Sequence, residues 1–172
     1  MYCSGTGRKI EHYSDAIYED GEWTSWDWIN RQLTLRDIKQ EFPEADQEVA
    51  EIFQDLVNTA QSYYEQTGRY LQIWGELGEL FAELRFGLKR HSPGHAGSDG
   101  RMGKDWIEIK TISPGKKKDL VMVKRAGNFN KVLLVKIDYS FGFECQLQDR
   151  KDLPKGKGKY IKVRWKADQS AE

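Results

Sequence analysis

The spacing of apolar residues changes partway along the chain, and this change limits the folds that the chain can adopt. Up to about residue 87 they recur at helical spacing, which predicts helices over residues 25–29, 34–42, 43–67 and 69–87. Short apolar runs follow, which predict strands over residues 106–112, 120–123, 132–137, 141–147 and 160–165. Helices followed by strands, without regular alternation, indicate a mixed α/β domain rather than a doubly wound sheet.

A charge asymmetry accompanies this change. Residues 1–80 contain 6 Lys/Arg and 16 Asp/Glu, whereas residues 81–172 contain 21 Lys/Arg and 11 Asp/Glu. A basic half suits a polyphosphate partner such as DNA. The acidic half argues against a protein that simply coats nucleic acid.

The segment GSDGRMGKDWIEIKTIS, residues 97–113, brings acidic groups and an ammonium group into one short stretch. Glu108 and Lys110 lie two residues apart in a predicted strand, so both point to one face. Ile109 between them points to the opposite face and into the core. A hairpin turn at Gly100–Gly103 would bring the Asp99 carboxylate back beside Glu108 and Lys110.

Such a trio suits phosphodiester hydrolysis. Carboxylate oxygens of the kind that Asp99 and Glu108 supply hold Mg²⁺, which prefers carboxylates together with several waters. The metal acidifies a water and neutralises charge on the phosphate. Lys110 would orient the water and stabilise the transition state.

The order of Asp, a spacer and Glu-x-Lys resembles the core motif of the PD-(D/E)XK nucleases, the restriction-endonuclease-like superfamily. That family commonly places an acidic helix ahead of the motif, and the segment GELGELFAELRFGL stands there in this chain. Glu79, preceded by Gly78, resembles the acid of that helix, and Glu76 is the alternative one turn earlier. Ser98 stands where the family usually has Pro before the first Asp. The resemblance covers roughly residues 75–138.

This resemblance implies a restriction-endonuclease-like core over residues 71–172, with a mixed central sheet flanked by helices, after an α-helical extension over residues 1–70. It implies a Mg²⁺-dependent deoxyribonuclease, an endonuclease of restriction or repair type, in which Mn²⁺ can substitute. Lys110 would position the attacking water. The implied metal ligands are Asp99, Glu108, the backbone carbonyl of Ile109, and Glu79 or Glu76.

Cations around the motif are the predicted DNA contacts, namely Arg101, Lys104, Lys116, Lys117 and Lys118. A second run, Lys155, Lys157 and Lys159, is a weaker candidate, because charge runs are usually solvated turns. His91 and His95 have no third ligand nearby, and we interpret them as surface loop residues. The Trp-rich segment 23–28 could stack on bases, but its acidic surroundings favour packing in a core or against a partner.

Further features of the sequence predict the cellular location of the protein and its alternative functions and partners. No apolar stretch is long enough for a membrane span, and the polar N-terminus does not resemble a signal peptide, so we expect a cytoplasmic protein without membrane contact. Cys3 and Cys145 are therefore expected to be reduced thiols. The alternative to an enzyme is a catalytically silent nuclease-fold module that binds DNA or protein. A homodimer or a protein partner would use the N-terminal helices, and RNA is the weaker alternative substrate.

Overall fold

The computed structural model describes residues 1–92 and 94–166. Contacts within the chain divide it into two compact units, Met1–Pro43 and a second unit that begins at Glu44. The boundary predicted from the sequence, at residue 70, separates an extension from a nuclease-like core and stays a prediction. No helix in the described ranges combines the length and apolar character needed to cross a membrane.

The first unit pairs a small hairpin with one long helix. Ser25 caps this helix, because its hydroxyl accepts a 3.3 Å hydrogen bond from the backbone N–H of Trp28. The helix runs through Thr34 without a break, and the Thr34 hydroxyl bonds back to the carbonyl of Asn30, so the prediction of two helices here is wrong. The elements are a 3₁₀ turn, Tyr13–Asp15, then β1, Ala16–Glu19, β2, Glu22–Ser25, and α1, Trp26–Glu41.

Two helices open the second unit, α2 (Gln47–Thr67) and α3 (Trp74–Phe86). The Asp46 carboxylate caps α2 by accepting hydrogen bonds from the backbone N–H groups of Glu48 and Val49. Gly68 ends the helix in the left-handed conformation, at φ 64°. The sequence predicted the end of α2 correctly, but it placed the start of both helices several residues early.

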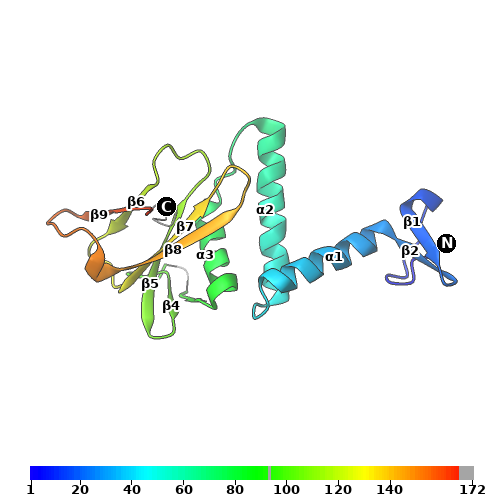
Figure 1. The fold of residues 1–172 in the computed structure, drawn as a ribbon, viewed down its shortest axis with the longest axis horizontal. Helices are drawn as coiled ribbons and strands as arrows, with labels where there is room; N and C mark the ends of the chain where they lie inside the picture. The colour runs from blue at the N-terminus through cyan, green and yellow to red at the C-terminus, as the bar shows by residue number, and fades with distance from the viewer. Residues whose placement is uncertain (93, 167–172) are drawn as a thin grey trace, which may run out of the picture. The chain divides into compact units, whose positions relative to one another are not determined.

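A five-stranded mixed sheet forms the centre of the second unit (Figure 1). Its order is β3-β4-β5-β7-β8, in which β5 and β7 are parallel and the other neighbours are antiparallel. With the three helices of the described residues, this sheet confirms a mixed α/β protein. The strands are β3 Lys89–Arg90, β4 Gly100–Met102, β5 Asp105–Ile112, β7 Lys131–Ile137 and β8 Phe143–Asp149.

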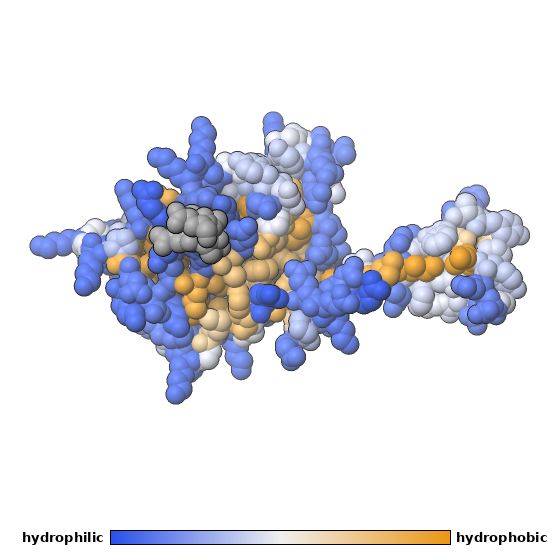
Figure 2. Space-filling model, viewed as in Figure 1, coloured by the Kyte–Doolittle hydropathy of each residue, from blue (hydrophilic) through white to orange (hydrophobic). Residues whose placement is uncertain are grey.

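Two further strands, β6 (Leu120–Lys124) and β9 (Tyr160–Arg164), pair with each other in a separate antiparallel sheet, the β6–β9 ribbon. A 3₁₀ turn, Arg150–Asp152, lies between β8 and β9. Hydrophilic side chains surround the end of the ribbon at which the chain enters β9 (Figures 1 and 2).

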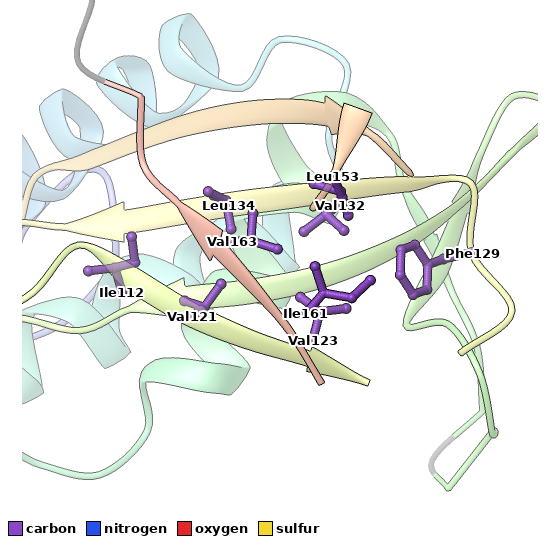
Figure 3. Close-up of a cluster of buried hydrophobic side chains, with 9 residues drawn as sticks. All are labelled: Ile112, Val121, Val123, Phe129, Val132, Leu134, Leu153, Ile161 and Val163. Carbon is purple, nitrogen blue, oxygen red and sulfur yellow. The ribbon is translucent and has the colours of Figure 1, made fainter. Parts of the chain in front are cut away.

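The central sheet is covered on both faces. Helix α3 packs against β5 and β7 on one face, and the β6–β9 ribbon lies against the other. Alternate residues of β7 serve the two faces, so the run from Val132 to Val135 is buried throughout. Figure 3 shows the core under the ribbon, made of Ile112, Val121, Val123, Phe129, Val132, Leu134, Leu153, Ile161 and Val163.

Candidate active site

The β4–β5 hairpin stops pairing where the acidic residues begin. Its last ladder pair is Gly100 with Ile107, and the N–H of Asp99 adds a 2.9 Å hydrogen bond to the Ile107 carbonyl. Beyond that point the Asp99 side chain takes the place of a paired strand, because its Oδ2 accepts a 2.6 Å hydrogen bond from the N–H of Ile109. The hairpin therefore fixes the Asp99 carboxylate against the edge of β5.

The ammonium group of Lys110 gathers three oxygen atoms at this edge. Its Nζ lies 2.7 Å from Glu108 Oε1 and 3.7 Å from Asp99 Oδ2, and it donates a 2.8 Å hydrogen bond to the carbonyl of Ile109. The Glu108 side chain is only 12% exposed. The side chain of Ile109 is buried on the opposite face, as the strand pattern predicted. Two carboxylates and one backbone carbonyl thus converge on a single positive charge.

These donors fit a hard divalent cation. All three are oxygens, the ligand type that Mg²⁺ prefers, and Mg²⁺ commonly uses one or two carboxylates with waters completing its shell. Among residues 1–92 and 94–166, no group of three or more Asp, Glu, His or Cys side chains is gathered closely enough to hold a metal. A cation here would therefore depend on Asp99, Glu108 and the Ile109 carbonyl, the oxygens that surround the Lys110 ammonium.

Glu79 on α3 is electrostatically linked to this cluster. Burial raises the pKa of its carboxyl, and the negative charges of Asp99 and Glu76 raise it further, against the opposing charges of Arg90 and Lys110. Arg90 pairs with both helix acids, with Glu76 at 2.6 Å and with Glu79 at 3.7 Å. Of the two helix acids that the sequence left open, Glu79 has the less exposed side chain, at 35% against 56% for Glu76, and its pKa responds to Asp99 and Lys110.

Helix α3 comes very close to β5 at Gly78. A Cβ atom at this position would lie 2.0 Å from Oγ1 of Thr111, so only glycine permits this approach. Thr111 directly follows Lys110 in β5, and Glu79 directly follows Gly78 in α3. The close contact thereby sets the position of the Glu79 backbone relative to the strand that carries Glu108 and Lys110.

A groove of about 580 Å³ contains the cluster. Asp99, Glu108 and Lys110 line it together with residues 95–98 and 126–128. The β6–β9 ribbon supplies another wall through Met122, Lys124 and Tyr160, three residues that the sequence did not single out. Ser98, at the position where the resembled family has Pro, is 3% exposed, and its hydroxyl has no hydrogen-bond partner among the described residues.

The cations predicted to contact DNA do not line this groove. Arg101 donates to the Gly103 carbonyl and lies over the Trp106 ring at 5.6 Å. The other predicted contacts are exposed on turns outside the groove lining, namely Lys104, Lys116, Lys117 and Lys118. Local charge runs could not reveal Lys124, because its position depends on the pairing of β6 with the distant β9.

The two histidines lie close to the groove. The rings of His91 and His95 are 4.2 Å apart between centroids, and the His91 ring lies 5.2 Å from that of Trp106. His95 is exposed and lines the groove, whereas Nε2 of His91 is buried without a hydrogen-bond partner among the described residues. Sequence spacing alone did not predict these contacts between tilted rings.

Arg150 fixes one wall of the groove. Its guanidinium donates to the carbonyls of Arg125, Gly127 and Phe129 at 2.6–2.9 Å and lies over the Phe129 ring at 4.4 Å. The groove-lining residues 126–128 lie between these anchored carbonyls. Nothing in the local sequence around Arg150 indicates this role, since its partners lie more than 20 residues earlier.

The first unit has a groove of its own, of about 810 Å³, beside Cys3 and Trp28. Two hydrogen bonds from Ser25, one from its hydroxyl and one from its backbone N–H, lower the pKa of the Cys3 thiol to about 6. Trp23 and Trp28 pack against the small core that contains Cys3, which agrees with the predicted packing role of this segment. Both cysteines are free thiols.

Comparisons with known proteins leave the family of this chain open. The chain matches no protein-family model, and no curated protein matches its sequence. Its function is therefore inferred from the chemistry of the residues that surround Lys110.

Proposed function

We propose that this protein is a metal-dependent nuclease that hydrolyses phosphodiester bonds of DNA, with a restriction-endonuclease-like core. The observation that carries the proposal is the convergence of Asp99, Glu108 and the Ile109 carbonyl around the Lys110 ammonium at an edge of β5. The adjoining acidic helix and the groove support it, because a substrate needs access to these groups. The cluster and the acidic helix, although not the groove, are also what the Asp, spacer, Glu-x-Lys resemblance implies.

The residues divide the chemistry among them. Asp99, Glu108 and the Ile109 carbonyl would hold Mg²⁺, which acidifies water and neutralises phosphate charge when bound. Lys110 donates hydrogen bonds, so it orients the attacking water and stabilises negative charge on the phosphate oxygens. The water oxygen would form a new P–O bond as the ester P–O bond breaks, and the leaving oxygen would take a proton from solvent water. Glu79 binds a proton more readily than an ordinary carboxylate, which suits it to accept the proton that the water loses.

Plasmid cleavage tests the proposal. Supercoiled, linear and single-stranded DNA are incubated with the protein in Mg²⁺, Mn²⁺ or EDTA, beside Lys110→Ala and the control Lys151→Ala, whose side chain is 77% exposed. We expect cleavage with either metal, none in EDTA, and a loss of about 100-fold or more in Lys110→Ala. DNA that stays intact in every form with both metals would refute a nuclease.

One observation favours a second candidate function, a module with this architecture that binds DNA or protein without turnover. The Lys110 ammonium already forms ion pairs with both Asp99 and Glu108, and the described ranges contain no group of three or more Asp, Glu, His or Cys side chains that could hold a metal. This candidate predicts binding that is unchanged by EDTA or by Lys110→Ala. Metal-dependent binding that is lost in Asp99→Ala would exclude it.

A further inference from the structure

The β6–β9 ribbon has one buried face and one exposed face. Strand alternation turns its valines and Ile161 into the core, so the side chains between them face outward. Antiparallel pairing sets Met122 opposite Lys162 and Lys124 opposite Tyr160. We call the outward set the ribbon face; it consists of Met122, Lys124, Tyr160, Lys162 and Arg164.

The ribbon face is continuous with the groove of the candidate active site. Three of its members, Met122, Lys124 and Tyr160, line the same groove as Asp99, Glu108 and Lys110. A polymer that lies on the ribbon face therefore reaches these acidic residues without crossing another element. Neither the resemblance to a nuclease family nor the motif itself assigns any role to this ribbon.

Charge on the ribbon face is of one sign. The segments 120–137 and 153–166, which contain both strands, hold no Asp or Glu. Lys124, Lys162 and Arg164 form no ion pair with any residue in the described part of the chain. Free cations that share one face attract a polyanion, and each phosphate contact displaces a counterion.

The turn that leads into β9 extends this positive surface. The Arg125 side chain donates to the carbonyls of Gly158 and Pro154, and its backbone N–H donates to the carbonyl of Lys159. These bonds hold the turn beside the end of β6 and the beginning of β9. The turn bears three lysines, Lys155, Lys157 and Lys159. Hydrophilic side chains project from this part of the second unit in Figure 2.

Apolar groups among the cations distinguish this face from a general phosphate-binding surface. The side chains of Tyr160 and Met122 are exposed to 40% and 45%. Duplex bases are already stacked on one another, so they offer these side chains no free ring face. The bases of a single strand do, and an aromatic ring between cations is the arrangement that binds single strands.

We propose that the ribbon face binds single-stranded DNA, with Lys124, Lys162 and Arg164 on its phosphates and Tyr160 stacked on a base, and leads the strand to Asp99 and Glu108. The assignment of this strand as the substrate rests on the proposed nuclease function. Binding to the ribbon does not, because none of the ribbon residues belongs to the candidate metal site.

Fluorescence anisotropy in EDTA measures this binding without turnover. The probes are a fluorescein-labelled 20-mer of thymidine and a labelled 20-base-pair duplex, titrated with the full chain at several salt concentrations. The test variant is Lys124→Ala/Lys162→Ala/Arg164→Ala, and the matched control removes three exposed lysines outside the groove, Lys116→Ala/Lys117→Ala/Lys118→Ala. A second pair, Tyr160→Ala and Tyr160→Phe, separates stacking from the hydroxyl group, and thermal melting confirms that each variant is folded.

We expect the single strand to bind more tightly than the duplex. The ribbon variant should weaken this binding about tenfold or more and make the slope of log K against log salt shallower by about 2, since each single-strand phosphate contact contributes about 0.7. Tyr160→Ala should weaken it about tenfold, and Tyr160→Phe about twofold at most.

Three results would overturn the proposal: equal or tighter binding of the duplex, a larger effect of the control variant than of the ribbon variant, or unchanged binding by Tyr160→Ala. Failure of the nuclease function would look different. DNA would then stay intact in Mg²⁺ and Mn²⁺ while ribbon-dependent binding in EDTA persisted. Conversely, metal-dependent cleavage together with unchanged binding by the ribbon variant would remove the ribbon proposal and leave the nuclease.

Discussion

The Asp99 carboxylate accepts a 2.6 Å hydrogen bond from the backbone N–H of Ile109. One oxygen of Asp99 therefore accepts from a backbone N–H that would bond to the carbonyl of a neighbouring strand elsewhere in the sheet. It also orients the peptide edge of β5, where the Ile109 carbonyl meets the Lys110 ammonium at 2.8 Å. A residue proposed to bind metal is therefore also part of the hairpin structure.

Substitutions at Asp99 should separate these two tasks. Asp99→Asn keeps an oxygen that accepts from the Ile109 N–H but removes the charge, so we expect the free energy of unfolding to change by about 1 kcal/mol or less. DNA cleavage in Mg²⁺ should nevertheless fall by about 100-fold or more, because the metal loses an anionic ligand. Asp99→Ala should in addition cost about 1–3 kcal/mol, since it leaves the Ile109 N–H unpaired. Urea unfolding and a cleavage assay on the same samples measure both effects; equal stability of the two variants would contradict the structural role.

Gly78→Ala should be destabilising although alanine is the better helix former. The gain in helix propensity is about 1 kcal/mol at most, whereas the new Cβ would lie 2.0 Å from Thr111 Oγ1. Overpacking of this kind costs about 1–3 kcal/mol, so the overpacking should outweigh the gain. Displacement of α3 should also reduce cleavage by moving Glu79.

Gly75 provides the matched control, because a Cβ there has no neighbour within 4 Å. Gly75→Ala should leave the melting temperature unchanged or raise it. Thr111→Ala combined with Gly78→Ala should recover part of the lost stability, because it removes the hydroxyl that the new Cβ meets. If Gly78→Ala melts at or above the wild-type temperature, helix and strand are not held at this distance.

Local patterns predicted much of this architecture. Periodicity located α2, α3 and the strands from β5 to β9 because each of these elements contains several apolar residues at regular spacing. The spacing of Asp99, Glu108 and Lys110 also predicted their convergence, which the structure shows, because a hairpin and strand alternation are local properties. The turn predicted at Gly100–Gly103 was placed too early, since Gly100–Met102 forms β4 and the chain turns at residues 103–104. Their roles in metal binding and catalysis stay predictions.

What the sequence did not predict depends on distant pairing. The groove wall at Lys124 and Tyr160 exists because β6 pairs with β9 across more than 30 intervening residues. No periodicity within either strand specifies that partner. The hairpin of β1 and β2 was missed because its strands have few buried residues and therefore little pattern.

Glu79→Gln should raise stability at neutral pH while it lowers activity. Burial and nearby carboxylates raise the pKa of Glu79, so the folded protein binds this proton more tightly than the unfolded chain does. The stability that protonated Glu79 contributes is thus present at pH values below the ordinary pKa of about 4.5, and it is lost as pH rises through the raised pKa. Above that range the charged carboxylate is unfavourable, and glutamine removes the charge.

Melting temperatures from pH 4 to 8 measure the effect. The advantage of Glu79→Gln over the wild type should be greatest at the upper end and should shrink towards pH 4. Glu83→Gln is the matched control, because Glu83 accepts a 2.8 Å hydrogen bond from Arg90 Nε, so its loss should lower the melting temperature instead. A Glu79→Gln protein that is less stable than the wild type at pH 8 would show that attraction to Arg90 and Lys110 dominates.

Arg150 should prove necessary for the groove although it contacts no proposed catalytic group. Its guanidinium donates to the backbone carbonyls of residues 125, 127 and 129, within and on both sides of residues 126–128. Hydrogen bonds from a charged donor contribute about 1.5–3 kcal/mol each without being additive. We expect Arg150→Ala to lower the free energy of unfolding by about 3 kcal/mol. Arg150→Lys should recover less than half of this loss, because an ammonium group lacks the planar array of donors. Urea unfolding measures these free energies, and Lys151→Ala, with its 77% exposed side chain, should leave the free energy of unfolding unchanged.

DNA cleavage by folded Arg150→Lys should fall, because the groove wall is disturbed. Full activity in this variant would show that residues 126–128 do not shape the substrate path.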